Sequence, residues 1–152
     1  MRVPPRIRAV DQDDFFDWVT LFAEAFEDSG LSYRDDVALR IWQQLGVTGP
    51  ALAHPAGIQS MVADRSGNLI GLALFSPSLS LTSGARALDI HLAYVHRAGR
   101  DQAATGALVE QLVRQAHRFG ATTLRWFAVG DAIRSAAGAR AVGNVQLAES
   151  TV

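Results

Sequence analysis

The stretch that decides the fold joins a strand to a helix and reads Val95-His96-Arg97-Ala98-Gly99-Arg100-Asp101-Gln102-Ala103-Ala104-Thr105-Gly106-Ala107-Leu108. Before it, Arg86 to Val95 has the alternation of a strand, and after it apolar residues recur at helical spacing as far as Phe119. Gly120 ends that helix, and Thr122 to Val129 reads as another strand. A strand, a helix and a second strand in this order predict a crossover between two parallel strands.

Two helices are expected upstream. The first begins after Asp11, which caps the helix with Asp14 three residues later, and it ends near Asp28. The second runs from Arg34 to Leu45 and is capped by Ser32. The apolar stripe of the first helix is formed by Phe15, Val19, Phe22, Ala23 and Phe26.

Four further segments have the pattern of strands. Arg6 to Val10 suits a short edge strand, and Ile58 to Ala63 pairs with Leu69 to Ser76 as a hairpin that Pro77 ends or bends. A final strand is expected at Asn144 to Ala148. Strict alternation in the strand from Arg86 predicts one face with Leu88, Ile90, Leu92 and Tyr94 and another with Asp89, His91, Ala93 and Val95.

The order of these elements predicts an α/β fold, in which a mixed central sheet is flanked by helices. A short segment from Asp131 to Ala137 is a further helix candidate. At 152 residues, with 49% hydrophobic and 19% charged residues, the chain suits a single domain over residues 1–152.

Composition excludes several chemistries. The chain has no Cys, and all 14 of its basic residues are Arg, so thiolate metal sites, a cysteine nucleophile and lysine Schiff bases are excluded. The His residues lack metal-ligand spacing, and no metal is expected. No basic stripe with aromatic residues indicates nucleic acid, and no apolar run approaches the roughly 20 residues that cross a bilayer. The chain is expected in the cytoplasm.

The opening stretch resembles the coenzyme-binding motif of the GNAT superfamily of N-acetyltransferases. In that family a strand ending in Val leads into Arg/Gln-x-x-Gly-x-Gly/Ala and then an apolar helix. Arg100 matches the first position, and Ala103 and Thr105 take the two positions of the small residues. The resemblance runs from Ile7 to about Val145 and implies the GNAT (acyl-CoA N-acyltransferase) fold, with acetyl-CoA as co-substrate and an amine as acceptor.

The resemblance also implies which residues bind the coenzyme. The backbone of the strand end would contact the acetyl and pantetheine arm, and the loop and helix N-terminus would hold the pyrophosphate. The implied binding residues are Ala93, Tyr94, Val95, Arg100, Asp101, Gln102, Ala103, Ala104, Thr105 and Asp131.

For catalysis the resemblance implies direct transfer of the acetyl group from the thioester to the amine. The family often places a general base on the strand before the loop, where this chain has His91 and Asp89. Of the two, His91 has the better intrinsic pKa for accepting a proton near neutrality. Each has a structural alternative: His91 as a partly buried, hydrogen-bonded side chain, and Asp89 as the partner of an Arg.

Two departures from the family pattern bear on function. The tyrosine that commonly protonates the departing thiolate is missing after the next strand, where Asp131 takes the place of the family's Asn. A rival function is therefore an inactive GNAT-like domain that binds an acyl-CoA or serves as an interaction module. After Gly138 only 14 residues remain. That is room for one strand and not a closing hairpin, and it predicts an open sheet edge for a homodimer.

Overall fold

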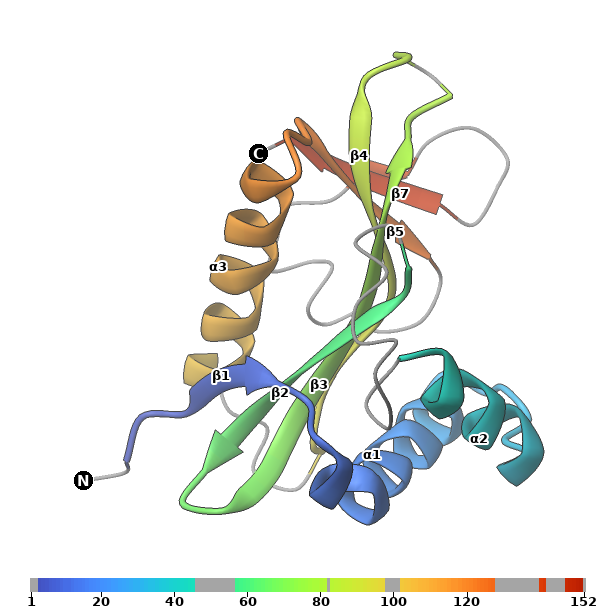
Figure 1. Cartoon of the computed structure of the whole chain (residues 1–152), viewed down its shortest axis with the longest axis vertical. Coiled ribbons are helices and arrows are strands. Elements are labelled where there is room, and N and C mark those ends of the chain that lie inside the picture. Colours follow the sequence, from blue (N-terminus) through green and yellow to red (C-terminus); the bar gives the residue numbers. More distant parts are fainter. Residues whose placement is uncertain are drawn as a thin grey trace.

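The computed structural model describes residues 3–45, 57–81, 83–97, 102–127, 140–141 and 147–151. Its strands form one seven-stranded sheet in the order β1-β2-β3-β4-β5-β7-β6 (Figure 1). The strands are β1 (Arg6–Ala9), β2 (Gln59–Arg65), β3 (Asn68–Leu79), β4 (Arg86–Val95), β5 (Thr123–Phe127), β6 (Arg140–Ala141) and β7 (Leu147–Thr151). The helices are a 3-10 turn η1 (Gln12–Asp14), α1 (Phe15–Asp28), α2 (Asp35–Gln44) and α3 (Gln102–Arg118).

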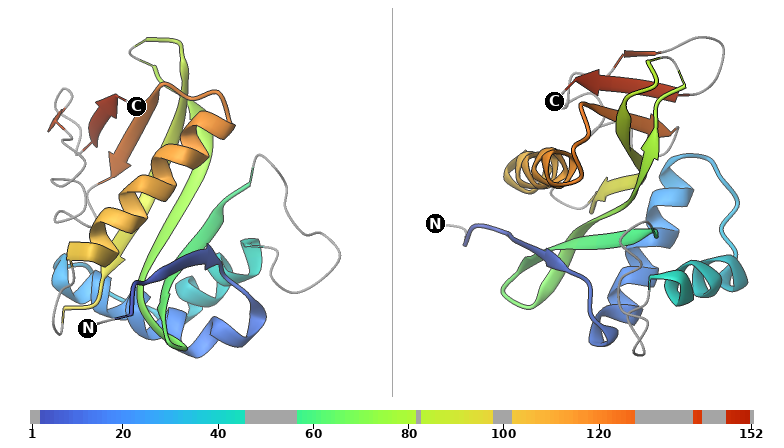
Figure 2. Two further views of the ribbon diagram at one scale, coloured as in Figure 1. Left: turned by 90° about the vertical axis from the view of Figure 1, so that its left-hand side faces the viewer. Right: turned by 45° about the horizontal axis from the view of Figure 1, so that its top comes forward.

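The sheet is mixed, as the sequence predicts. Strands β4 and β5 are parallel and are joined by α3, whereas the other described pairs are antiparallel. Helix α3 covers one face of the sheet, and α1 and α2 cover the other (Figure 2). Leu108 and Trp126 are buried in the cluster beneath α3, and Trp18, Phe22 and Trp42 in the cluster beneath α1 and α2. Each such side chain contributes about 1.5–3 kcal/mol on burial.

The cap predicted at Asp11 opens the 3-10 turn η1, which leads into α1 at Phe15. The Asp11 carboxylate accepts a hydrogen bond from the backbone of Asp13 at 2.9 Å, and Asp14 accepts one from the backbone of Asp11 at 2.9 Å, which completes a capping box. The buried residues of α1 are Trp18, Leu21, Phe22, Glu24 and Ala25. Of the predicted stripe, Phe22 is buried, and Phe15, Val19 and Phe26 are half-buried against the same core cluster, so the stripe is confirmed in part. Helix α1 has apolar residues on more than one face, and its contacts with the sheet determine which of them are buried.

Helix α2 begins at Asp35, and the predicted cap at Ser32 is wrong. The N-cap is Arg34, whose side chain makes no capping hydrogen bond. Asp35 and Asp36 instead lie in the first turn, where carboxylates interact favourably with the positive end of the helix dipole.

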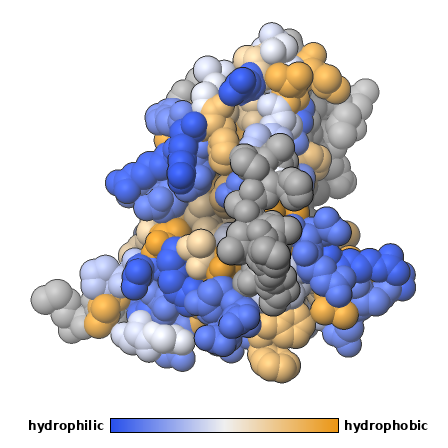
Figure 3. Space-filling model, in the orientation of Figure 1, coloured by the Kyte–Doolittle hydropathy of each residue, from blue (hydrophilic) through white to orange (hydrophobic). Residues whose placement is uncertain are grey.

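Strand β3 continues through Pro77 as far as Leu79, so this proline does not end the strand. Strand β2 stops at Gln59, opposite Phe75, and beyond that point β3 pairs with β4 alone. The missing N–H of Pro77 therefore falls on a part of β3 that β2 no longer borders, as prolines in strands require. Apolar side chains gather at the top of Figure 3, where the tip of the β3–β4 hairpin carries the exposed Leu79 and Leu81.

The C-terminal residues form two strands where one was predicted. Strand β7 lies along β5, from Thr123 opposite Thr151 to Phe127 opposite Leu147, and the short β6 pairs with β7. Beyond β5 the sheet thus carries the antiparallel pair β7 and β6, so the expectation that a closing hairpin is missing is wrong. The homodimer stays a prediction. The helix candidate from Asp131 to Ala137 lies outside the described residues.

No helix within the described ranges combines the length and the apolar character needed to cross a membrane.

Candidate functional site

Strand β5 pairs with only the first part of β4. Their ladder starts with Ala87 opposite Thr123 and ends with Ile90 opposite Trp126. Strand β4 continues to Val95 and stays paired with β3 on its other side, so from residue 91 onward its second edge faces no described strand. We call this opening the β4–β5 fork. A strand edge without a neighbouring strand can bind an extended ligand through its backbone.

A β-bulge places His91 at the mouth of the fork. The register between β3 and β4 steps from Leu74 opposite Leu92 to Phe75 opposite Ile90, which leaves His91 as the extra residue on β4. The bulge shifts the alternation, so the two predicted faces of this strand are wrong. The buried residues beneath α3 are Leu88, Ile90, Ala93 and Val95, and those beneath α1 and α2 are Leu92 and Tyr94.

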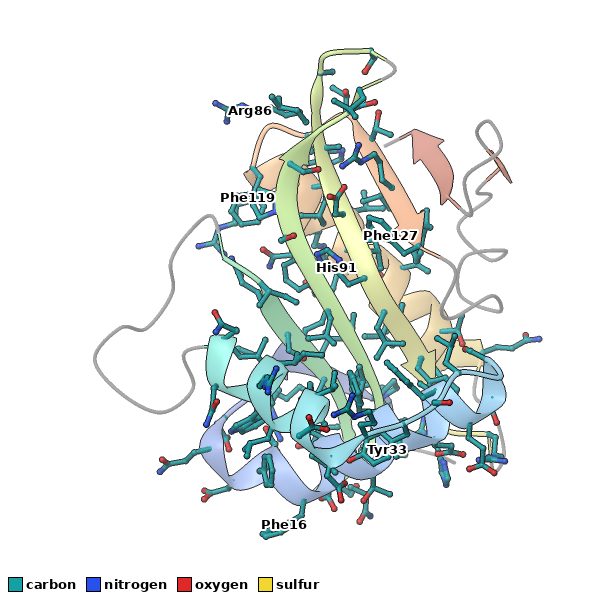
Figure 4. All side chains as sticks on the ribbon, turned by 90° about the vertical axis from the view of Figure 1, so that its right-hand side faces the viewer. Phe16, Tyr33, Arg86, His91, Phe119 and Phe127 are labelled. Carbon is teal, nitrogen blue, oxygen red and sulfur yellow. The ribbon has the colours of Figure 1, made fainter. Side chains whose placement is uncertain are left out.

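Side chains from both neighbouring strands contact the His91 ring. Its Nε2 lies 2.7 Å from Oγ of Ser76 on β3, and its ring stacks on Phe127 of β5 with centroids 5.3 Å apart (Figure 4). Burial lowers the pKa of the imidazole, and the nearby Asp89 carboxylate opposes this shift only in part. His91 is therefore neutral near pH 7 and able to accept a proton.

Asp89 binds Arg125 of β5. The carboxylate accepts hydrogen bonds from Nε at 2.6 Å and Nη2 at 2.9 Å, and Nη2 also donates to Oγ of Ser78 at 3.0 Å. The two side chains are only 10% and 12% exposed. The structure thus gives Asp89 the Arg partner that was the alternative to a catalytic role. Because its carboxylate oxygens are occupied by two charged hydrogen bonds, Asp89 is a poorer candidate for the base than His91.

The coenzyme-binding residues implied at the start of α3 differ in accessibility. Gln102 and Ala103 are exposed, Thr105 is half-buried and Ala104 is fully buried beneath the helix. The side chain of Ala104 therefore packs in the core, which leaves its backbone as the part that can contact a ligand. The remaining implied residues Arg100, Asp101 and Asp131 lie outside the described residues.

The implied residues on β4 lie beyond the ladder with β5. Ala93 and Val95 direct their side chains into the core beneath α3, so any contact with a coenzyme in the fork would involve their backbone. Gly71 on β3 permits the close packing here. A Cβ at this position would lie 3.0 Å from the carbonyl oxygen of Tyr94 and 3.1 Å from Cδ1 of Leu108.

Both tyrosines of the chain donate a hydrogen bond to a carboxylate. The hydroxyl of Tyr33 donates to Asp35 at 2.7 Å, and that of Tyr94 donates to Asp28 at 2.6 Å. Burial together with the carboxylate raises the pKa of Tyr33 to about 12 and raises that of Tyr94 as well. Neither hydroxyl is a good proton donor for a thiolate, because its proton already binds a carboxylate.

A buried carboxylate links α1 to the end of β4, just before the predicted coenzyme loop. Glu24 accepts hydrogen bonds from Nε of Arg97 at 2.7 Å and lies 2.6 Å from Nδ1 of His96. Burial favours a higher pKa for Glu24, but the hydrogen bonds from Arg97 and His96 outweigh it and hold the pKa below its ordinary value. The residues that enter the loop are thereby held against α1. A pocket of about 140 Å³ beside them is lined by Asp17, Thr20, Leu21, Glu24, Asn68, Leu69 and His96.

Sequence reasoning missed three residues of this site: Ser76, Arg125 and Phe127. Ser76 lies in no nucleophile motif, and its partner is 15 residues away in the chain. Arg125 and Phe127 alternate with the buried Leu124 and Trp126, a pattern that places them on the opposite face of β5. This alternation was the sequence pattern from which Arg125 and Phe127 could have been assigned to the face of β5 that carries the site. Among the described residues, no three His, Asp or Glu side chains are grouped as metal ligands.

This sheet, with its β4–β5 fork, α3 on one face and α1 and α2 on the other, is the GNAT acyl-CoA N-acyltransferase fold, and the expected fold class is confirmed. The chain is similar to a predicted acetyltransferase from Clostridium acetobutylicum crystallised with acetyl-CoA, at a TM-score of 0.71 and 16% identity, over 92% of each chain. It is also similar to a ribosomal-protein-alanine N-acetyltransferase from Brucella melitensis biovar Abortus 2308, at a TM-score of 0.64 and 20% identity, over 90% of this chain and 89% of that one.

A third similar structure is AAC(6')-Iy in complex with a bisubstrate analogue that contains CoA, at a TM-score of 0.65 and 16% identity, over 82% of this chain and 79% of that one. No family model matches the chain, and no curated protein matches it in sequence. Identities this low establish the shared fold and not a shared substrate.

Proposed function

We propose that this chain is an N-acetyltransferase of the GNAT superfamily, which transfers the acetyl group of acetyl-CoA to the amine of a small molecule or peptide. The observation that carries the proposal is a neutral histidine at the mouth of the β4–β5 fork, where the edge of β4 faces no strand among the described residues. The location expected from the sequence, the cytoplasm, is part of the same proposal.

The residues around the fork suit acetyl-CoA as co-substrate. The β4 edge from Ala93 to Val95 can hold an extended arm by backbone hydrogen bonds, and the first turn of α3 provides the positive end of a helix dipole for the pyrophosphate. Two of the similar structures were solved with acetyl-CoA or a CoA analogue. Those complexes support the assignment without fixing the acceptor.

Acetyl-CoA would supply an activated thioester, and the chain would supply positioning and proton transfer. The amine nitrogen bonds to the acetyl carbon, the carbon–sulfur bond breaks with its electron pair leaving on sulfur, and His91 takes the amine proton. General-base help of this kind contributes about 10²- to 10⁴-fold in rate. The departing thiolate takes its proton from solvent, because Tyr33 and Tyr94 donate to carboxylates.

The second candidate is an inactive domain that binds an acyl-CoA. It is favoured by Ala103 and Thr105 at the small-residue positions of the loop motif, and by the absence of a tyrosine with a disengaged hydroxyl among the described residues. The two candidates share the binding step and differ in turnover.

Calorimetric titration with acetyl-CoA and with desulfo-CoA, followed by thiol release over a panel of amines, distinguishes the candidates. Binding with turnover supports the enzyme, and binding without turnover on any amine supports the inactive domain. If neither ligand binds below about millimolar concentration, both candidates fail. In the enzyme, His91→Gln lowers turnover about 10²- to 10⁴-fold and keeps coenzyme affinity, whereas the control His117→Gln, on the exposed end of α3, changes neither.

A further inference from the structure

The β-bulge directs His91 into contact with a serine that no motif in the sequence marks. Ser76 lies on β3, on the side of β4 away from β5, and its Oγ is 2.7 Å from Nε2 of His91. Phe127 of β5 stacks on the same ring at an interplanar angle of 17°. The ring thus has a polar contact at one edge and an aromatic contact on one face, and both restrict its rotation.

The hydrogen bond to Ser76 distinguishes the two nitrogens of the ring. Nε2 is engaged on the β3 side, whereas Nδ1 makes no hydrogen bond within the described part of the chain. A neutral imidazole carries one proton, so one nitrogen donates and the other keeps a lone pair. If Nε2–H donates to the serine oxygen, the lone pair of Nδ1 is left to accept a proton.

We propose that Ser76 is a positioning residue for His91: its oxygen accepts the Nε2–H hydrogen bond, fixes the tautomer and leaves Nδ1 to take the proton of the acceptor amine. This inference rests on the proposed acetyl transfer for its catalytic consequence. The role corresponds to that of any group that orients a histidine base through its second nitrogen. The proton passes from the amine to Nδ1 and then to solvent, so the balance of the transfer reaction is unchanged.

The surrounding charges are consistent with a neutral base. Asp89, two residues before His91 on β4, binds Arg125 of β5 at 2.6 Å. Ser78, two residues along β3, binds Arg125 and not His91. Ser76 and Ser78 therefore bind different partners, so a substitution of Ser78 is a matched control for the same substitution of Ser76.

Nitrogen NMR of the histidine rings tests the tautomer without any need for activity. In the wild type, Nε2 of His91 is expected to carry the proton and Nδ1 to be unprotonated above the pKa, with the signals assigned through His91→Gln. Ser76→Ala is expected to give a mixture of tautomers, Ser76→Thr to restore the single one, and Ser78→Ala to leave it unchanged. A wild-type ring protonated at Nδ1, or a Ser76→Ala ring identical to the wild type, overturns the proposal.

Kinetics test the catalytic consequence. Ser76→Ala should lower kcat about 10- to 100-fold, part of what a general base contributes, with KM for acetyl-CoA unchanged. Because the serine oxygen also stabilises the imidazolium, its loss lowers the pKa of His91, and the acid limb of the pH profile moves to lower pH. In a His91→Gln background the same substitution should have no further effect.

Two results contradict the kinetic argument. An additive loss in the double variant would mean that Ser76 does not act through His91. An acetyl adduct on Ser76, found by mass spectrometry after mixing with acetyl-CoA, would make it a nucleophile and overturn its positioning role. If the wild type releases no thiol with any amine, the proposed function fails separately, and the NMR experiment still decides whether Ser76 sets the tautomer.

Discussion

Replacing Asp89 by Asn tests whether this residue stabilises the fold or takes part in chemistry. The substitution keeps the shape of the side chain and removes its charge opposite Arg125, to which it makes hydrogen bonds of 2.6 and 2.9 Å. Both side chains are about nine-tenths buried, so the substitution removes a charged partner of the guanidinium in a poorly solvated place. Removing one partner of such a pair costs 3–5 kcal/mol, and we expect about 3 because the amide oxygen still accepts one hydrogen bond.

The assay is a double-mutant cycle measured by urea unfolding. We expect Asp89→Asn and Arg125→Met each to destabilise the fold by about 3 kcal/mol, and the double variant to lose much less than their sum, because each single variant already removes the interaction between the two side chains. Single-variant losses below about 1 kcal/mol, or strict additivity, would refute the argument that the pair is structural.

The Asp89→Asn variant also distinguishes an Asp89 that only raises the pKa of His91 from an Asp89 that is itself the general base. Since the Asp89 carboxylate raises the pKa of His91, its removal should lower that pKa and move the acid limb of the rate profile to lower pH, with the maximum rate kept. A loss of maximum rate as large as that in His91→Gln, in a variant that remains folded, would restore Asp89 as the base.

Three further predictions concern the fold and the coenzyme. The folded-state pKa of Glu24 lies below its ordinary 4.5, so its contribution to stability is complete above pH 4.5 and declines as the pH falls below it; Glu24→Gln should flatten this part of a pH series of urea unfolding curves, and an unchanged slope would contradict the argument. Gly71→Ala should destabilise the fold by about 1–3 kcal/mol in thermal or urea unfolding, because the new Cβ would meet a backbone oxygen at 3.0 Å, and a variant as stable as the wild type would show that the strands adjust freely. Arg100→Ala should weaken the calorimetric affinity for acetyl-CoA by about 1–3 kcal/mol, as the loss of a charged hydrogen bond does, and equal affinity would place the pyrophosphate elsewhere.

Local patterns in the sequence determined the elements of this protein and their order. The strand from Arg86 to Val95, the cap at Asp11 and the strand–helix–strand crossover depend on neighbouring residues, and the structure confirms each of them. These features are predictable because backbone propensity, capping and hydrophobic periodicity act over a few residues. The same reasoning placed a candidate base at His91, because residue type alone carries its ordinary pKa.

Contacts between distant strands decided the rest. Which face of α1 is buried depends on the sheet beneath it, and the partners of His91 and Asp89 come from strands 15 and 36 residues away in the chain. The bulge at residue 91 arises from the register between β3 and β4, which no pattern within one strand reveals. The sequence by itself thus determined the fold class and the candidate residues. Only the tertiary structure decided that Asp89 binds an arginine and that His91 is a partly buried, neutral side chain at the mouth of the fork, because burial and charge pairing exist only once the strands are assembled.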